Sequence, residues 1–259
     1  MLNTQVYTPD LPTDHPPLVI VHGLFGSARN WGATAKRLSG ARLVVVPDMR
    51  NHGHSPGTAT HSYPELAADL SEVIDALGGI ADVLGHSMGG KAAMILALMH
   101  PGRVRRLIVA DIAPVAYGHD QRQHIQAMRA LSLEGLTTRA EADRRLAATT
   151  PDPALRAFFL QSLDLKTEGG PRWRLNLDTL EAEMPAILGW PSPLGRFDGA
   201  TLFLSGAESR YVLPEHRRDI TALFPAARFA RIPGAGHWLH AEKPREFEAA
   251  VQVFLDHAG

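Results

Sequence analysis

Short apolar runs alternate with stretches of helical spacing along most of the chain. The apolar runs are rich in Val, Ile and Leu, a pattern typical of strands that are buried on both faces. The stretches between them carry apolar residues three or four positions apart, as Leu66, Leu70, Val73 and Ile74 do. The expected strands are residues 18–23, 42–47, 81–84, 106–111, 201–206 and 228–233, and the expected helices include residues 30–38, 63–77, 90–99 and 246–255. Strands that alternate with helices predict an α/β fold with a mainly parallel central sheet flanked by helices.

The alternation stops between residues 115 and 195. This stretch shows no short β-like runs and several helical ones. Thr138 and Glu141 have the spacing of a capping box, and Asp152 before Pro153 is typical of an N-cap followed by proline at the first helical position. We therefore predict a helical cap, residues 115–195, inserted into a core domain of residues 1–114 and 196–259.

The composition is that of a globular protein without a strong electrostatic preference. The 259 residues are 45% hydrophobic and 20% charged, with a formal net charge of -1, so no global field attracts nucleic acid or an anionic membrane. The absence of cysteine excludes disulfides, thiolate zinc sites and a cysteine nucleophile. No histidine spacing indicates a metal site, and no segment reads as a signal peptide or a membrane span. We expect a cytoplasmic protein that acts on a small molecule without metal or cofactor.

One motif, Gly85-His86-Ser87-Met88-Gly89, lies between a predicted strand and a predicted helix. Gly-x-Ser-x-Gly in this setting is the nucleophile elbow, a turn so sharp that the residues two before and two after the serine must be small. The strained turn lifts the serine hydroxyl clear of the sheet, and the N-terminus of the following helix faces developing negative charge. Ser87 is therefore the candidate nucleophile.

Further candidates follow from the rule that active sites of parallel sheets lie at the carboxyl ends of the strands. The residues to consider there are His22, Asp48, Ser87, Asp111, Glu208 and His237. A serine hydroxyl needs a base within hydrogen-bond reach. His237 lies in a glycine-rich loop after the last expected strand, from which its ring can reach the elbow, and we predict that it is this base. The order nucleophile, acid, histidine is also that of α/β-hydrolases.

The histidine needs a carboxylate that holds its tautomer, and the residues leave two candidates. The usual place is the turn after Gly206, but the position expected for the acid is occupied by Ser209, and Glu208 lies one residue early. Asp111, at the end of the preceding strand, is the other candidate.

The negative charge of a tetrahedral intermediate needs backbone donors. The N–H of Met88, directly after the nucleophile, supplies one donor. The second is expected from the loop after the first buried strand, where Leu24 is the candidate and Phe25 a possible alternative. We expect His22 to brace that loop rather than act as an acid or base. A structural, non-catalytic role is also expected for the polar residues of the next loop: Asp48, Arg50, Asn51, His52 and His54.

Together these motifs resemble the α/β-hydrolase superfamily over nearly the whole chain. The motifs are His22-Gly23, Asp48-x-Arg50-x-x-Gly53-x-Ser55, Gly85-His86-Ser87-Met88-Gly89-Gly90 and Gly236-His237. The segments 22–27, 48–53, 85–92, 111–115 and 234–244 look most like the bacterial YbfF-type esterases and their mitochondrial relatives. The resemblance implies an α/β-hydrolase fold and a serine hydrolase of esters and thioesters, including acyl-CoA. It also implies that the triad acid follows the family's sixth strand, which here is Asp111. Glu208 departs from the branch, which tends to carry a smaller, neutral residue there.

The leading hypothesis is therefore a carboxylic ester or thioester hydrolase with a Ser87 acyl-enzyme. The same triad also suits a cofactor-free haloperoxidase-like enzyme or a carbon–carbon bond hydrolase, and the scaffold can serve as a non-catalytic small-molecule receptor. The complete set of Ser87, Asp111 and His237 favours an enzyme. Epoxide hydrolases and dehalogenases are disfavoured because they need Asp where Ser87 stands.

Overall fold

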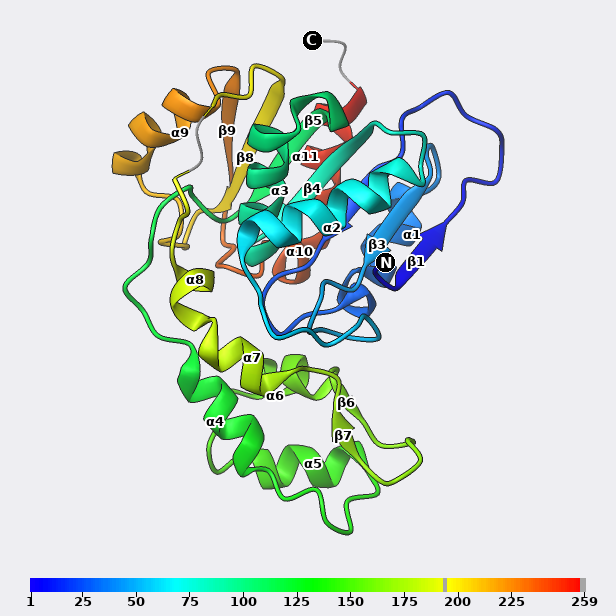
Figure 1. Cartoon of the computed structure of the whole chain (residues 1–259), viewed down its shortest axis with the longest axis vertical. Helices are drawn as coiled ribbons and strands as arrows, with labels where there is room; N and C mark the ends of the chain where they lie inside the picture. The colour runs from blue at the N-terminus through cyan, green and yellow to red at the C-terminus, as the bar shows by residue number, and fades with distance from the viewer. Residues whose placement is uncertain (193–194, 257–259) are drawn as a thin grey trace.

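A seven-stranded sheet forms the centre of the molecule (Figure 1), seen in a computed structural model that describes residues 1–192 and 195–256. The strand order is β1-β3-β2-β4-β5-β8-β9, and neighbouring strands are parallel except β1 against β3. The strands are β1 (Thr4–Tyr7), β2 (Leu18–Val21), β3 (Val44–Pro47), β4 (Ala81–His86), β5 (Val104–Ala110), β8 (Ala200–Gly206) and β9 (Ala227–Ile232). The predicted mainly parallel sheet is confirmed.

Helices cover both faces of the sheet. On one face lie α2 (Tyr63–Asp75), α3 (Met88–Met99) and α9 (Arg217–Leu223), and on the other lie α1 (Gly32–Leu38), α10 (Leu239–Glu242) and α11 (Pro244–Asp256). Successive strand residues point to opposite faces, so Val19 and Val21 pack under the first layer while Leu18 and Ile20 pack under the second. All four side chains are fully buried. Burial on both sides explains why these strands are continuous apolar runs.

Some local structure departs from the pattern of the sequence. The predicted helix 30–38 begins with a 3-10 turn, Ala28–Trp31, before α1. Strand β1 was not predicted, since it is a short edge strand whose residues alternate between exposed and half-buried. Two further 3-10 turns, Pro101–Arg103 and Pro214–His216, precede β5 and α9.

The stretch between β5 and β8 is mostly helical, as predicted. Its helices are α4 (Arg122–Ala130), α5 (Arg139–Leu146), α6 (Pro153–Leu160), α7 (Leu177–Ala182) and α8 (Met184–Leu188). Thr138 accepts a hydrogen bond from the Glu141 amide at 3.2 Å, and Asp152 accepts one from the Ala154 amide at 2.8 Å, so both predicted N-caps are present. The sequence pattern did not reveal β6 (Leu163–Asp164) and β7 (Arg172–Trp173), which form a hairpin too short for a periodic signal.

We call the stretch between β5 and β8 the cap. Helices α4–α7 lie away from the helices that cover the sheet (Figure 1), whereas α8 is joined to α2 by a hydrogen bond from the Tyr63 hydroxyl to the Ile187 carbonyl oxygen. Residues 193–194 of the predicted cap lie outside the described residues. The division into a core of residues 1–114 and 196–259 and a cap of residues 115–195 stays a prediction. Within the described part of the chain, no helix has both the length and the apolar character needed to cross a bilayer.

Candidate active site

Ser87 stands at the sharp turn between β4 and α3. Its backbone angles, φ 53° and ψ -120°, lie in a region that residues with a side chain rarely adopt. The turn is possible because Gly85 and Gly89, which flank Ser87, have no side chain. A Cβ on Gly85 would lie 2.2 Å from the carbonyl oxygen of Gly89, and a Cβ on Gly89 would lie 2.4 Å from that of Val21. The turn therefore has the packing that the elbow motif predicts.

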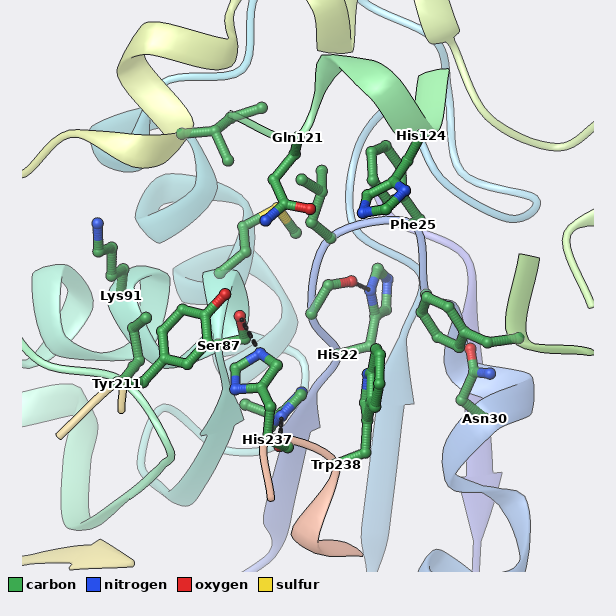
Figure 2. Close-up of a pocket in the computed structure, with 18 of the residues that line it drawn as sticks. His22, Phe25, Asn30, Ser87, Lys91, Gln121, His124, Tyr211, His237 and Trp238 are labelled. Atoms are coloured by element: carbon green, nitrogen blue, oxygen red, sulfur yellow. Dashed lines mark hydrogen bonds between the residues drawn. The ribbon is translucent and has the colours of Figure 1, made fainter. Parts of the chain in front are cut away.

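Ser87, His237 and Asp111 lie in one hydrogen-bonded row. Ser87 Oγ is 3.1 Å from His237 Nε2, and His237 Nδ1 is 2.7 Å from Asp111 Oδ2 (Figure 2 shows the first pair). The three residues follow β4, β9 and β5, so the strand order brings together residues that are up to 150 positions apart in the chain. His86, directly before the nucleophile, supports the row because its Nε2 lies 2.9 Å from the His237 carbonyl oxygen.

Asp111 is held in place by the loop after β8. Its side chain is fully buried, and its φ of 53° turns it out of the line of β5. Oδ1 accepts a hydrogen bond from the Gly206 amide at 3.1 Å, and Oδ2 accepts one from the Ser209 hydroxyl. These bonds satisfy a buried carboxylate that would otherwise be costly to desolvate.

Glu208 is not part of this row. Its amide donates to the Ala235 carbonyl oxygen at 2.9 Å, which fixes the backbone of the turn. Among the described residues, no hydrogen bond or ion pair joins the Glu208 carboxylate to His237. Ser209, which occupies the usual acid position but cannot itself serve as the acid, is the residue of this turn that reaches Asp111.

The predicted oxyanion donors lie in two places: Leu24 and Phe25 in the loop after β2, and Met88 at the start of α3. The Phe25 amide already donates to His52 Nε2 at 3.2 Å. For the Leu24 amide, no acceptor is found in the part of the chain that the structure describes. Met88 is the first residue of α3, where an amide has no partner within its own helix. The Leu24 and Met88 amides thus have no acceptor among the described residues, and their role as oxyanion donors stays a prediction.

A cavity of about 240 Å³ opens beside Ser87 and His237. The core contributes Leu24, Met88 and Tyr211, and the cap contributes Leu155, Phe158 and Phe159. Phe158 and Phe159 therefore line the cavity and also pack in the hydrophobic interior. Tyr211 stacks on the His237 ring, with centroids 3.9 Å apart and planes inclined by 21°. Burial raises the pKa of Tyr211 to about 12, so its phenol stays protonated.

Lys91 is a buried cation in the same cavity. It lies one helical turn after Ser87, is 1% exposed, and donates from Nζ to the carbonyl oxygens of Leu188 and Gly189 at 3.0 and 2.6 Å. Burial lowers its pKa to about 7. Sequence reasoning missed this residue, because a lysine on a helix is usually exposed to solvent.

The structural role expected of the remaining candidates stays a prediction, which the contacts of His22 and Asp48 support. His22 Nε2 accepts from the Met49 amide at 2.9 Å, and Asp48 accepts from the amides of Ala28 and His54 at 2.8 and 2.9 Å. His54 is exposed on the same loop.

Comparison with known proteins agrees with this geometry. A family model described as alpha/beta hydrolase fold matches residues 16–244. The match spans most of the chain, which therefore belongs to the α/β-hydrolase family.

Relatives with assigned activities cover the chain almost completely. The mouse (Mus musculus) protein named sn-1-specific diacylglycerol lipase ABHD11 is 41% identical over 250 residues, which is 93% of this chain and 81% of the relative. Esterase YbfF of Escherichia coli (strain K12) is 37% identical over 257 residues, 98% of this chain and 99% of the relative. A solved structure titled Marine microorganism esterase superposes with a TM-score of 0.92 at 34% identity and covers 98% of both chains. These similarities identify the chain as an enzyme of the carboxylic ester hydrolase class.

Proposed function

We propose that this protein hydrolyses carboxylic esters and thioesters through an acyl-enzyme on Ser87. The observation that carries the proposal is the row Ser87 Oγ, His237 Nε2, His237 Nδ1 and Asp111 Oδ2, with separations of 3.1 and 2.7 Å. A nucleophile within reach of a base that is itself oriented by a third group is the arrangement required for nucleophilic catalysis.

Each step of the proposed reaction has a residue beside it. His237 accepts the Ser87 proton while Oγ attacks the carbonyl carbon, and Asp111 stabilises the resulting imidazolium. The Leu24 and Met88 amides bind the oxyanion of the tetrahedral intermediate. His237 then gives its proton to the departing alcohol or thiol, which leaves Ser87 acylated. A water molecule, deprotonated by His237, attacks the acyl-enzyme. His237 returns that proton to Ser87 Oγ as the carboxylic acid is released.

The size and lining of the cavity bear on the acyl group. Its volume of about 240 Å³ is small beside the roughly 300–1,000 Å³ of common ligand pockets. Leu155, Phe158 and Ile187 give it apolar walls. Both features support a preference for short, apolar acyl groups over long ones.

Hydrolysis of matched substrates tests the proposal. Purified protein is given p-nitrophenyl esters and CoA thioesters of the same graded acyl groups, with and without a chelator. We expect turnover of short acyl esters that is unchanged by the chelator and lost in Ser87→Ala. Activity that disappears with the chelator and returns with zinc or manganese would contradict a metal-independent serine hydrolase. Turnover of the esters but of no thioester would restrict the proposal to esters.

A further inference from the structure

Two histidines hold the loops beside Ser87 by a reciprocal exchange of hydrogen bonds. His22 belongs to the loop after β2 and accepts from the amide of Met49, in the loop after β3, at 2.9 Å. His52 belongs to that second loop and accepts from the amide of Phe25, in the first, at 3.2 Å. Each loop thus donates one amide to a histidine of the other, and the two rings lie 5.1 Å apart. We call this pair the imidazole clamp.

The clamp requires both rings to be neutral and in the same tautomer. A backbone amide can only donate, so Nε2 of each ring must be the acceptor and Nδ1 must carry the proton. Each Nδ1 has a matching acceptor, Gly23 oxygen at 2.8 Å for His22 and Arg50 oxygen at 2.9 Å for His52. Burial lowers the pKa of both imidazoles, which keeps them neutral.

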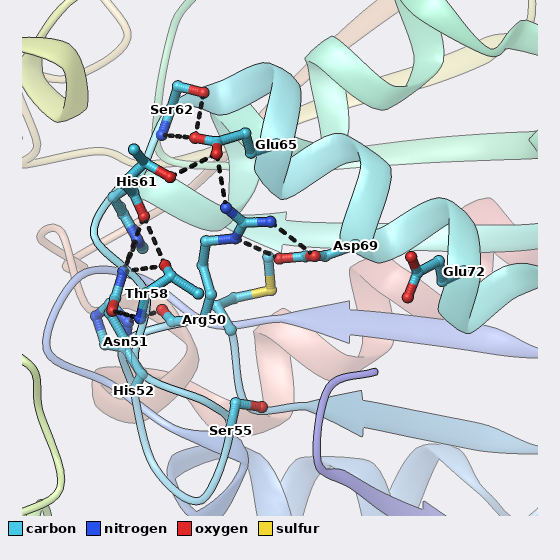
Figure 3. Close-up of polar contacts among 12 residues, drawn as sticks. Arg50, Asn51, His52, Ser55, Thr58, His61, Ser62, Glu65, Asp69 and Glu72 are labelled. Atoms are coloured by element: carbon cyan, nitrogen blue, oxygen red, sulfur yellow. Dashed lines mark hydrogen bonds and ion pairs between the residues drawn. The ribbon is translucent and has the colours of Figure 1, made fainter.

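The acceptor for His52 is itself fixed in space. Figure 3 shows the Arg50 side chain bound to α2 through Asp69, with an Nε–Oδ2 distance of 2.6 Å, and through Glu65 at 3.0 Å. The neighbouring Asn51, with a φ of 65°, accepts from the Thr58 amide at 2.7 Å and donates to the Thr60 carbonyl oxygen at 3.0 Å. His52 therefore projects from a rigid loop toward the loop that contains Leu24 and Phe25.

We propose that His52 is a positioning residue for the oxyanion loop, the segment His22–Gly26. By holding the Phe25 amide, it removes that amide from the site and leaves the adjacent Leu24 amide to face the substrate carbonyl. The φ of 63° at Phe25 fits this account, since a bulky residue keeps such a backbone conformation only where its surroundings impose it. This inference rests on the oxyanion role proposed above for Leu24.

Substitutions that retain different halves of the imidazole separate positioning from packing. His52→Asn retains a donor near Nδ1 and loses the acceptor at Nε2, whereas His52→Gln retains an acceptor near Nε2. His54→Ala is the matched control, because His54 lies on the same loop with a side chain that is 62% exposed. The measurements are the rate of Ser87 modification by a fluorophosphonate probe, kcat and KM for p-nitrophenyl acetate, and the midpoint of urea unfolding.

We expect His52→Asn to lower the labelling rate and kcat by about 10- to 100-fold with little change in KM, since small displacements of oxyanion donors have effects of this size. His52→Gln should recover most of the loss, and His54→Ala should match the wild type. Folded His52→Asn protein labelled at the wild-type rate would overturn the proposal. If His52→Asn does not fold, the test rests on folded His52→Gln. A labelling rate of this variant close to that of the wild type supports the proposal. A labelling rate that is lower by 10-fold or more contradicts it. A wild-type protein that reacts with the probe but hydrolyses no ester overturns the proposed function alone, because the labelling rates still test His52.

Discussion

The Ser209 hydroxyl donates a hydrogen bond to Oδ2 of Asp111, the same oxygen that faces His237 Nδ1. Ser209 occupies the turn after β8, where the acid of a triad is usually expected, while the acid comes from the end of the neighbouring strand β5. The hydroxyl therefore connects the usual acid position to the carboxylate that orients the histidine.

Loss of the Ser209 hydroxyl should weaken catalysis without abolishing it. Ser209→Ala removes one charge-assisted hydrogen bond from Asp111, and we expect kcat to fall about ten-fold, equivalent to about 1.4 kcal/mol, with KM unchanged. Ser209→Thr, which retains a hydroxyl, should recover much of the activity. Steady-state kinetics on a short p-nitrophenyl ester measures both variants. Equal kcat in the wild type and Ser209→Ala would show that the bond has no catalytic consequence.

Removal of the negative charge should lower turnover far more at Asp111 than at Glu208. Asp111→Asn leaves His237 without the acceptor that selects its tautomer, and we expect turnover to fall by roughly three to four orders of magnitude, about 4–5.5 kcal/mol. Glu208→Gln should have a much smaller effect, because no hydrogen bond or ion pair joins the Glu208 carboxylate to His237 among the described residues. Circular dichroism and thermal melting must first confirm that both variants fold. A collapse of turnover in Glu208→Gln alone would reverse the two assignments.

The sheet, Ser87 and His237 could be predicted because their signals lie in short segments of the sequence. Buried parallel strands show as apolar runs, and the elbow shows as small residues around Ser87 between a strand and a helix. Strand β1 and the β6–β7 hairpin have no comparable signal, since one is a half-exposed edge and the other has two residues per strand.

The acid and the loop contacts depend on tertiary structure. Asp111 and Glu208 both follow strands, so the residue pattern alone does not separate them. The family resemblance implied Asp111, and the order β5-β8-β9 together with the loop path brings its carboxylate to His237. The reciprocal contacts of His22 and His52 join loops that are 27 residues apart, and no spacing within either loop indicates them.

Gly89 should tolerate no side chain. The Cβ of Gly89→Ala would lie 2.4 Å from the Val21 carbonyl oxygen and 2.5 Å from that of His22, both of them backbone atoms. We expect the free energy of unfolding to fall by about 1–3 kcal/mol or more, as in other overpacked sites. Gly102→Ala is the control, because a Cβ there meets nothing within 4 Å. Urea unfolding measures both variants, and equal stability of the two would contradict the packing of the elbow.

Lys91 should make stability depend on pH. Its pKa falls from 10.5 to about 7 on folding, so between these values the unfolded chain binds more protons than the native state. The contribution of Lys91 to the free energy of unfolding therefore rises with pH across this window, by at most about 1.4 kcal/mol per pH unit. Below about pH 7 the lysine is charged in both states and the contribution stops changing.

Lys91→Met removes the titrating amine, and the methionine side chain is close in size to that of lysine. Urea unfolding of both proteins at about pH 6, 8 and 10 should show the wild type gaining stability relative to the variant as the pH rises. A difference that stays constant across the range would contradict the lowered pKa.

The formation of a covalent bond to Ser87 is the direct test that this residue is the nucleophile. Wild-type protein and Ser87→Ala are treated with a fluorophosphonate probe, and the modified peptide is located by mass spectrometry. We expect one adduct, on the peptide that contains Ser87, and no adduct in Ser87→Ala. Labelling that persists in the variant on another serine would contradict the assignment of Ser87 as the nucleophile.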